Sequence, residues 1–169
     1  MRRSLLLALL TLLTIAAPAG AVPVVGCQET EREWPWMVYL NQGRQEIEID
    51  PSNYCGGSLI APTWVMTAAH CITDEVVDPL ITTVVIGRHS QSNDEGERIQ
   101  ARRVVVHEEY PSNGTPDVAL IELERAPAAA VTPLQIAAPG EDALYAPGTM
   151  ATVLGWGNTS SDGSASDVL

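Results

Sequence analysis

Basic residues are scarce in this chain. Its 169 residues include 9 basic and 21 acidic side chains, which gives a formal net charge of −12. A surface this acidic repels phosphate backbones and anionic lipid headgroups. The composition therefore argues against nucleic acid as a partner and favours solubility and cationic partners, without identifying a substrate.

Long apolar runs are absent after residues 1–21, so no later segment is expected to cross a membrane. The first segment has the layout of an export signal: two arginines, an apolar run over 5–17 and a small-residue cleavage site at 19–21. Pro18 and Gly20 argue against an uncleaved anchor helix. We predict a signal peptide at residues 1–21 and a secreted, extracellular protein. Loss of the two arginines would change the net charge from −12 to −14.

Cysteine is also sparse, and three cysteines in an exported chain leave one over. Cys55 and Cys71 bound the stretch CGGSLIAPTWVMTAAHC, in which His70 precedes the second cysteine. Apolar and β-branched runs at 58–60 and 64–67, separated by a proline-containing turn, predict two strands and then a bend that carries His70. A bond between the two cysteines would staple this unit and contribute about 3 kcal/mol in the chain-entropy model.

This stretch resembles the segment around the catalytic histidine of trypsin/chymotrypsin-like serine proteases. The resemblance implies that His70 is the general base of a Ser-His-Asp triad, and that Cys55 and Cys71 form the disulfide bracing its loop. The alternative is a structural histidine capped by a nearby carbonyl. Between the cysteine and the strand, Gly56 and Gly57 permit either a tight bend or a close approach of the backbone.

A second stretch, DVALIEL at 117–123, resembles the D-I-A-L-L-x-L segment of the same family. The resemblance implies that Asp117 orients His70. A buried carboxylate that accepts from the imidazole N–H fixes the tautomer and stabilises the imidazolium formed during the reaction. An aspartate that opens an apolar strand could instead cap a turn. The order and spacing of the two stretches favour the catalytic role.

The N-terminal region carries Val24-Val25-Gly26-Cys27 ahead of a Trp-Pro-Trp-Met-Val run. The resemblance implies that Val24 is the mature N-terminus, whose ammonium pairs with an aspartate beside the nucleophilic serine. Two departures stand out: Cys27 replaces a glycine, and Pro23 replaces the usual Arg or Lys. We hypothesise that residues 22–23 are a pro-dipeptide removed by a proline-directed dipeptidase. The rival interpretation is a bacterial lipobox, with Cys27 acylated as a lipid anchor.

The sequence predicts no metal and no cofactor. A strand is expected over 81–87, and Arg88 follows it where calcium-binding relatives carry a glutamate. Calcium requires several oxygen ligands, so the polar loop at 89–97 is interpreted as a solvated acidic turn with His89 at the surface. Another strand is expected over 102–107. His107 lacks the second histidine of an H-E-x-x-H zinc site and is assigned a packing role.

The resemblance divides the rest of the chain into two parts. Residues 24–125 form the N-terminal antiparallel β-barrel of an all-β double-barrel fold, which carries His70 and Asp117. Residues 126–169 form a linker rich in proline and alanine and an incomplete second barrel, whose first strand is expected at 151–157.

The family's nucleophile lies in a Gly-Asp-Ser-Gly-Gly segment, about ninety residues beyond the aspartate. No such segment occurs here, and Ser161, Ser164 and Ser166 come too early and lack a following glycine pair. We therefore expect a fragment of a monomeric serine endopeptidase that acts on polypeptides, inactive by itself. The alternative is a non-catalytic exported binding module or a lipid-anchored pseudoprotease. An unpaired strand at 151–157, with little for Trp156 to pack against, favours the fragment.

Overall fold

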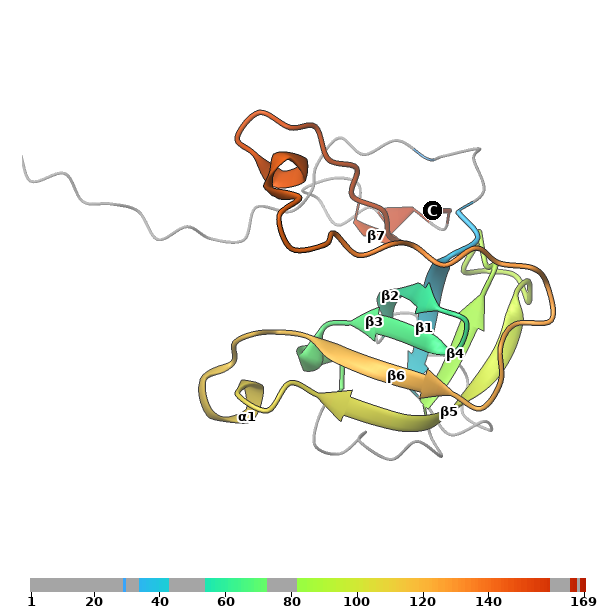
Figure 1. Ribbon diagram of the computed structural model, residues 1–169. Coiled ribbons are helices and arrows are strands. Elements are labelled where there is room, and N and C mark those ends of the chain that lie inside the picture. Colours follow the sequence, from blue (N-terminus) through green and yellow to red (C-terminus); the bar gives the residue numbers. More distant parts are fainter. Residues whose placement is uncertain (1–28, 30–33, 43–53, 73–81, 159–164, 167) are drawn as a thin grey trace, which may run out of the picture.

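Six antiparallel strands close into a barrel (Figure 1). This computed structural model describes residues 29, 34–42, 54–72, 82–158, 165–166 and 168–169. The strands follow the order β1-β2-β3-β6-β5-β4, and β1 pairs with β4 to complete the circle. Their bounds are β1 (Met37–Gln42), β2 (Tyr54–Ala61), β3 (Trp64–Thr67), β4 (Thr82–Ile86), β5 (Glu97–Val106) and β6 (Ala119–Leu123). The predicted all-β fold with an antiparallel barrel is confirmed.

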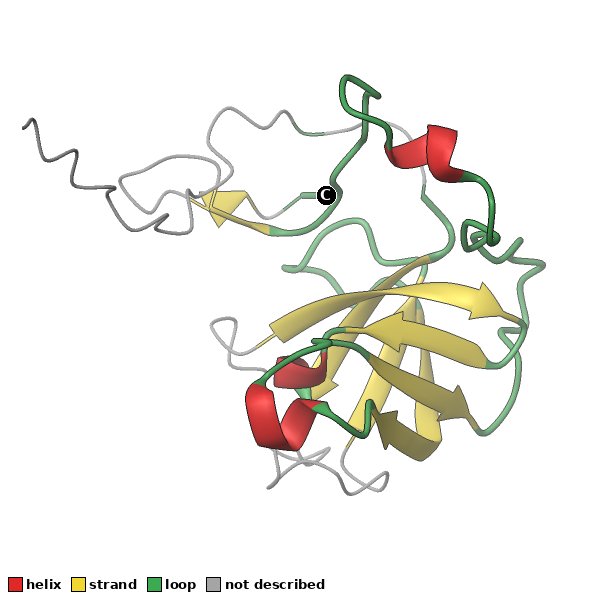
Figure 2. Cartoon of the chain, turned by 60° about the vertical axis from the view of Figure 1, so that its left-hand side comes forward, coloured by secondary structure: helices red, strands yellow, loops and turns green. Residues whose placement is uncertain are grey.

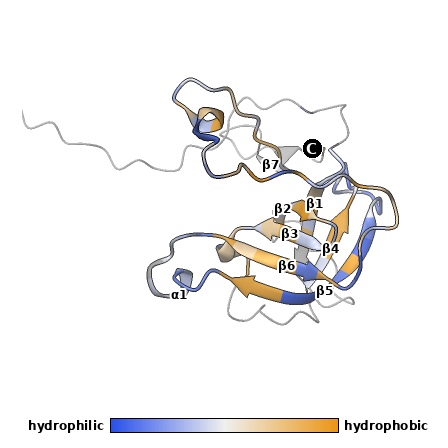
Figure 3. Cartoon of the chain, in the orientation of Figure 1, coloured by the Kyte–Doolittle hydropathy of each residue, from blue (hydrophilic) through white to orange (hydrophobic). Residues whose placement is uncertain are grey.

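Alternating side chains of the strands fill the barrel. In β6, Ala119, Ile121 and Leu123 are buried, while Leu120 and Glu122 between them are only partly so. This period of two is what a strand with one face in a core requires. Figure 3 shows apolar stretches along β5 and β6. The buried cluster consists of Val38, Leu40, Leu59, Val65, Ala69, Ile72, Val84, Ile86, Ile99, Ala101, Ala119, Ile121 and Leu123.

The observed strands extend or trim the predicted ones. The run at 64–67 coincides with β3, whereas the run at 58–60 is the second half of a longer β2. The run at 102–107 falls in β5, which begins at Glu97 and ends one residue earlier than predicted. The glycine pair was expected to permit either a tight bend or a close approach of the backbone. Gly57 permits the close approach of β2 to β3, because a Cβ there would stand 2.9 Å from the Met66 carbonyl oxygen.

The connection after β6 is irregular and follows the outside of the barrel (Figure 1, orange). Glu97, at the start of β5, holds the first residues of this connection. Its carboxylate accepts hydrogen bonds from the Arg125 guanidinium and, at 2.7 Å, from the Ala128 backbone N–H. Further along, the Leu134 backbone N–H donates to the Leu59 carbonyl at 2.8 Å. A short 3₁₀ turn, Asp142–Tyr145, interrupts the connection.

The strand predicted at 151–157 does not form. Residues 151–155 have no strand pairing among the described residues, and pairing begins with β7 (Gly157–Asn158), which joins β8 (Ala165–Ser166). β-Branched and aromatic composition favours an extended chain, but a strand also requires a neighbour to share its hydrogen bonds. The prediction, which rested on the resemblance, was wrong because a matching segment does not by itself supply that neighbour.

Trp156, for which little packing was expected, is 8% exposed. Its ring meets that of Tyr39 edge-on at a centroid distance of 5.6 Å, and its indole N–H donates to the His89 carbonyl at 2.9 Å. A second apolar cluster forms around this contact on the outer face of β1, from Met37, Tyr39, Val85, Trp156 and Leu169. The connection nevertheless exposes apolar side chains, among them Met150 and Val153.

Two short helical turns lie at one end of the barrel (Figure 2): the 3₁₀ turn Ala69–Cys71 after β3, and α1 (Tyr110–Asn113) after β5. No helix in the described part of the chain has the length and apolar character needed to span a bilayer.

Candidate active site

His70 lies in the 3₁₀ turn that follows β3. The strand ends at Thr67, Ala68 keeps an extended backbone (φ −77°, ψ 146°), and the chain then tightens over Ala69–Cys71. Backbone hydrogen bonds from Cys71 to Ala68 (3.2 Å) and from Ile72 to Ala69 (2.8 Å) close the turn. Ala69 and Cys71 are buried, whereas the side chain of His70 between them is exposed.

Asp117 reaches the same end of the barrel through strand register. β3 and β6 are antiparallel neighbours in which Thr67 pairs with Ala119. Asp117 precedes Ala119 by two residues, just before β6, and His70 follows Thr67 by three residues, in the turn after β3. The register therefore brings together two side chains that are 47 residues apart in the sequence.

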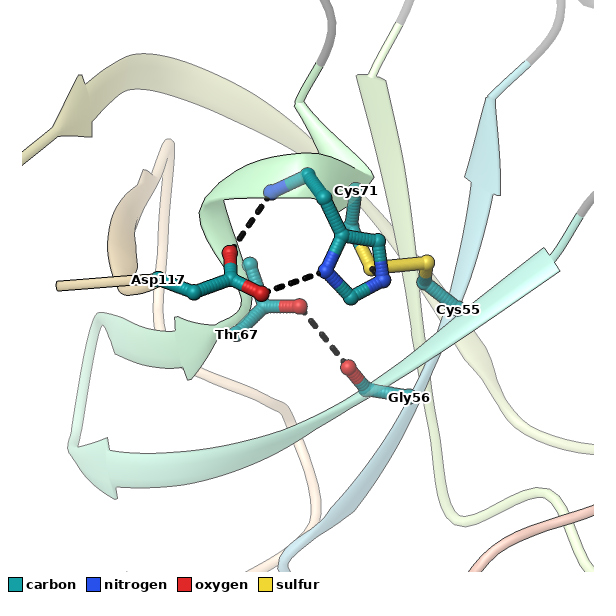
Figure 4. The surroundings of a disulfide bond; sticks show 6 residues. Cys55, Gly56, Thr67, Cys71 and Asp117 are labelled. Atoms are coloured by element: carbon teal, nitrogen blue, oxygen red, sulfur yellow. Dashed lines mark hydrogen bonds and ion pairs between the residues drawn. A yellow bond between two sulfur atoms is a disulfide. The ribbon is translucent and has the colours of Figure 1, made fainter. Parts of the chain in front are cut away.

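One carboxylate holds His70 at two points (Figure 4). Asp117 Oδ2 is 2.6 Å from the imidazole Nδ1, and Asp117 Oδ1 accepts the His70 backbone N–H at 2.9 Å. Hydrogen bonds from the His70 side chain and then from its backbone N–H hold the pKa of the Asp117 carboxyl below its ordinary value. An ionised carboxylate only accepts hydrogen bonds, so Nδ1 must carry the proton. In a neutral imidazole, Nε2 then has a lone pair available for a proton.

The pair is more open than the sequence led us to expect. The His70 side chain is 62% exposed and that of Asp117 is 39% exposed, whereas we expected a buried carboxylate. Asp117 lies just before β6, in an exposed stretch of the chain. Because water competes for exposed charges, such a pair contributes little to folding. Its geometry bears on chemistry more than on stability.

A disulfide joins Cys71, at the end of the turn, to Cys55 in β2, as the resemblance implied. The Cα atoms are 6.1 Å apart, and Figure 4 shows the bridge beside the imidazole. Cys71 Sγ is 3.6 Å from His70 Nε2. The bridge thus ties the turn to the neighbouring strand directly next to the ring.

The residues at the site do not suit a metal ion. In the described part of the chain, the one group of three potential ligands is Cys55, His70 and Cys71. Metals bind cysteine as thiolate, and both sulfurs are committed to the disulfide. At the loop where calcium was considered, Arg88 is 3% exposed, its guanidinium lies 5.0 Å from the Tyr39 ring centre, and its Nε donates to the Glu95 carbonyl.

The remaining residues named in the sequence analysis either lie outside the described residues or make contacts other than those of the His70–Asp117 pair. Val24 and Cys27, the signal peptide and the pro-dipeptide lie outside the described residues. His89 is half-buried, and its carbonyl anchors the Trp156 indole. His107, predicted to pack near its loop, accepts the Glu109 backbone N–H on Nδ1 at 3.3 Å.

Thr67 is a residue at this site that the sequence analysis did not single out. Its side chain is 6% exposed, and its hydroxyl donates to the Gly56 carbonyl at 2.8 Å. The signal was a hydroxyl residue at the end of an apolar strand, three residues before the histidine. Buried hydroxyls are hydrogen-bonded as a rule, but the sequence does not name the partner.

A closed six-stranded barrel with a histidine–carboxylate pair at one end is the architecture of a trypsin-like barrel. The chain belongs to the Trypsin family, whose family model matches residues 23–169.

Two relatives illustrate the match. The chain is 42% identical over 148 residues to a protein named Trypsin from Saccharopolyspora erythraea, which covers 86% of this chain. It is 31% identical over 156 residues to the Suppressor of tumorigenicity 14 protein homolog of Bos taurus, again covering 86% of this chain. The chain spans 60% of the length of the first relative and 17% of the second.

Proposed function

We propose that this chain is the histidine- and aspartate-bearing part of a secreted serine endopeptidase that hydrolyses polypeptides. The observation that carries the proposal is the double contact of one carboxylate with His70. Asp117 binds both the backbone N–H and Nδ1 of His70, which leaves Nε2 as the proton acceptor. General-base catalysis requires an imidazole held in this tautomer and orientation.

In the proposed reaction, His70 Nε2 takes the proton from a serine hydroxyl as the serine attacks the peptide carbonyl. The imidazolium then returns that proton to the leaving amine, and an acyl-enzyme remains for water to hydrolyse. Asp117 stays ionised, since the hydrogen bonds from His70 lower its pKa, and it offsets the positive charge on the ring. The chain has no Gly-Asp-Ser-Gly-Gly segment. We assign the nucleophile to the portion of the relatives' length that these 169 residues do not span.

The proposal is tested by expressing the gene through its own stop codon. We expect the full product to react with a fluorophosphonate probe and to cleave peptides, and the 169-residue chain to do neither. Asp117→Asn should lower kcat by about 10⁴-fold. Asp94→Asn is the matched control, because it alters a carboxylate that is 98% exposed and pairs with Arg98 instead.

Two results would overturn the proposal. One is a gene that ends after codon 169, or one whose continuation lacks a glycine-flanked serine; a non-catalytic binding module would then be the better assignment. The other is stable fluorophosphonate labelling of the 169-residue chain at Ser161 or Ser164.

Export and maturation complete the proposal. A signal peptide at residues 1–21 would direct the chain out of the cell. Removal of residues 22–23 would expose Val24 as the N-terminus of a monomeric enzyme. N-terminal sequencing of secreted, active protein should give Val24 as the first residue. Full activity in material that begins at Val22 would contradict the maturation step while leaving the reaction in place.

A further inference from the structure

Both ends of the His70 turn are tied to consecutive residues of one strand. Before the turn, the Thr67 hydroxyl donates to the Gly56 carbonyl at 2.8 Å. After the turn, Cys71 is bonded to Cys55. Figure 4 shows the disulfide beside the imidazole and the Thr67–Gly56 hydrogen bond below it, and both links reach residues of β2. The ends of the turn therefore cannot separate from β2 unless one of the links breaks.

The turn has few constraints of its own. It is three residues long, and Ala68 at its start provides no side-chain cap. Its two backbone hydrogen bonds run from Cys71 and Ile72 to the carbonyls of Ala68 and Ala69, so they set its shape but not its position relative to the strands. Short 3₁₀ segments have poorer hydrogen-bond geometry than α-helices. The position of this one therefore depends on the burial of Ala69 in the core and on the links at its two ends.

Asp117 makes that position critical. Its two oxygens accept from two different atoms of His70, at 2.9 and 2.6 Å. A small displacement of the turn would lengthen both contacts together, since both donors belong to one residue. Thr67 is the last strand residue before the turn, and it pairs with Ala119, two residues after Asp117. It is thus connected to β2 by its hydroxyl and to β6 by its backbone.

We propose that Thr67 is a positioning residue: its hydroxyl, acting through the turn, keeps His70 in register with Asp117. The disulfide fixes the far end of the turn, and Thr67 fixes the near end. The catalytic use of this positioning rests on the proposed function, but the pairing of His70 with Asp117 can be measured in the 169-residue chain without any nucleophile.

The test compares four substitutions in that chain. Thr67→Val removes the hydroxyl and keeps the shape, Thr67→Ala removes it with less bulk, and Thr67→Ser retains it. Thr83→Val is the matched control, because the Thr83 hydroxyl donates to a side chain on β5, Gln100, at 3.3 Å. The readouts are the pH titration of the Asp117 carboxyl carbon by NMR and the exchange rate of the His70 backbone amide, both taken on folded protein.

We expect the Asp117 carboxyl to titrate below its ordinary value of 3.8 in the parent chain, in Thr67→Ser and in Thr83→Val. In both hydroxyl-free variants the midpoint should rise toward 3.8, because the donors that lower this pKa move away. The His70 amide should exchange about tenfold faster, as expected when a buried hydrogen bond is lost. Having two hydroxyl-free variants keeps the test decisive if one of them does not fold.

The outcomes separate the two proposals. An unchanged Asp117 titration in a folded hydroxyl-free variant would overturn the role of Thr67 and leave the proposed function standing. A parent chain whose Asp117 titrates at the ordinary value would show that the pair does not form in solution, and both proposals would fail. If Thr83→Val changed the Asp117 titration and the His70 exchange rate equally, the effect of Thr67 would be a general loosening of the barrel. That result would overturn the positioning role of Thr67.

Discussion

The adjacent glycines of β2 offer a sharp test of the packing that supports the site. A Cβ added at Gly57 would stand 2.9 Å from the Met66 carbonyl oxygen and 3.0 Å from Val65 Cγ1. Both atoms belong to β3, which is held between β2 and β6, and Val65 is fully buried in the core. Neither neighbour can give way without shifting the strand. At Gly56, by contrast, the nearest atom to a new Cβ is the Val38 carbonyl oxygen at 3.9 Å, an ordinary contact.

The two substitutions should therefore change the free energy of unfolding in opposite directions. Overpacking makes Gly57→Ala destabilising by about 1–3 kcal/mol. Gly56→Ala should stabilise the fold by about 0.4–1 kcal/mol, because alanine restricts the unfolded chain and has room in the folded one. The difference in the free energy of unfolding between the two variants is then about 1.4–4 kcal/mol.

Urea denaturation of the oxidised chain measures this difference. The denaturation midpoints of the parent chain and the two variants report stability directly when the slopes of their three curves agree. Each glycine serves as the control for the other, since the chemical change is identical and the positions are consecutive. A Gly57→Ala variant as stable as Gly56→Ala would refute the close approach of β2 to β3, and with it the frame proposed to hold the His70 turn.

Three further predictions concern the links around the barrel. Replacing Cys55 and Cys71 together by alanine should lower the free energy of unfolding by about 3 kcal/mol, measured by denaturation without reductant, and a loss near zero would contradict this. Because the folded pKa of Asp117 is lowered, its contribution to stability is complete above 3.8 and disappears as pH falls through the folded value. The stability difference between the parent chain and Asp117→Asn should shrink accordingly on acidification, and a difference that stays constant between neutral and acid pH would argue against the pairing. Arg125 and a backbone N–H lower the pKa of Glu97 in the same way. Glu97→Gln should therefore speed amide exchange at Ala128 above pH 4.5 and have little effect in acid, whereas equal effects at both pH values would rule out a charge-dependent link.

Much of the barrel could be predicted from the sequence. The run at 64–67 became β3 without change, and the runs at 58–60 and 102–107 became parts of longer strands. These predictions succeeded because a run of apolar and β-branched side chains of strand length, bounded by turn residues, is a local property of the chain. The residues of the candidate site came from their resemblance to a family, and the structure brings His70 and Asp117 into contact. Their catalytic roles remain a proposal.

The failures share a cause. The run at 151–157 resembles a strand of the family, but residues 151–155 have no described partner and Trp156 packs against Tyr39. Asp117 was expected to be buried and is partly exposed, since burial depends on what the rest of the fold places over it. Arg88 was identified as a cation in a loop, but its burial beside Tyr39 was not foreseen.

The sequence by itself determined the class of fold, the two residues that could share a proton, and the cysteines available to brace them. Only the tertiary structure decided that Thr67 lies opposite Ala119 and bonds to Gly56, and hence how the histidine turn is held. The physical reason is that a strand's side-chain pattern states which face is apolar but not which strand lies beside it, or in which register. The neighbour and the register of each strand depend on how all six strands pair to close the barrel.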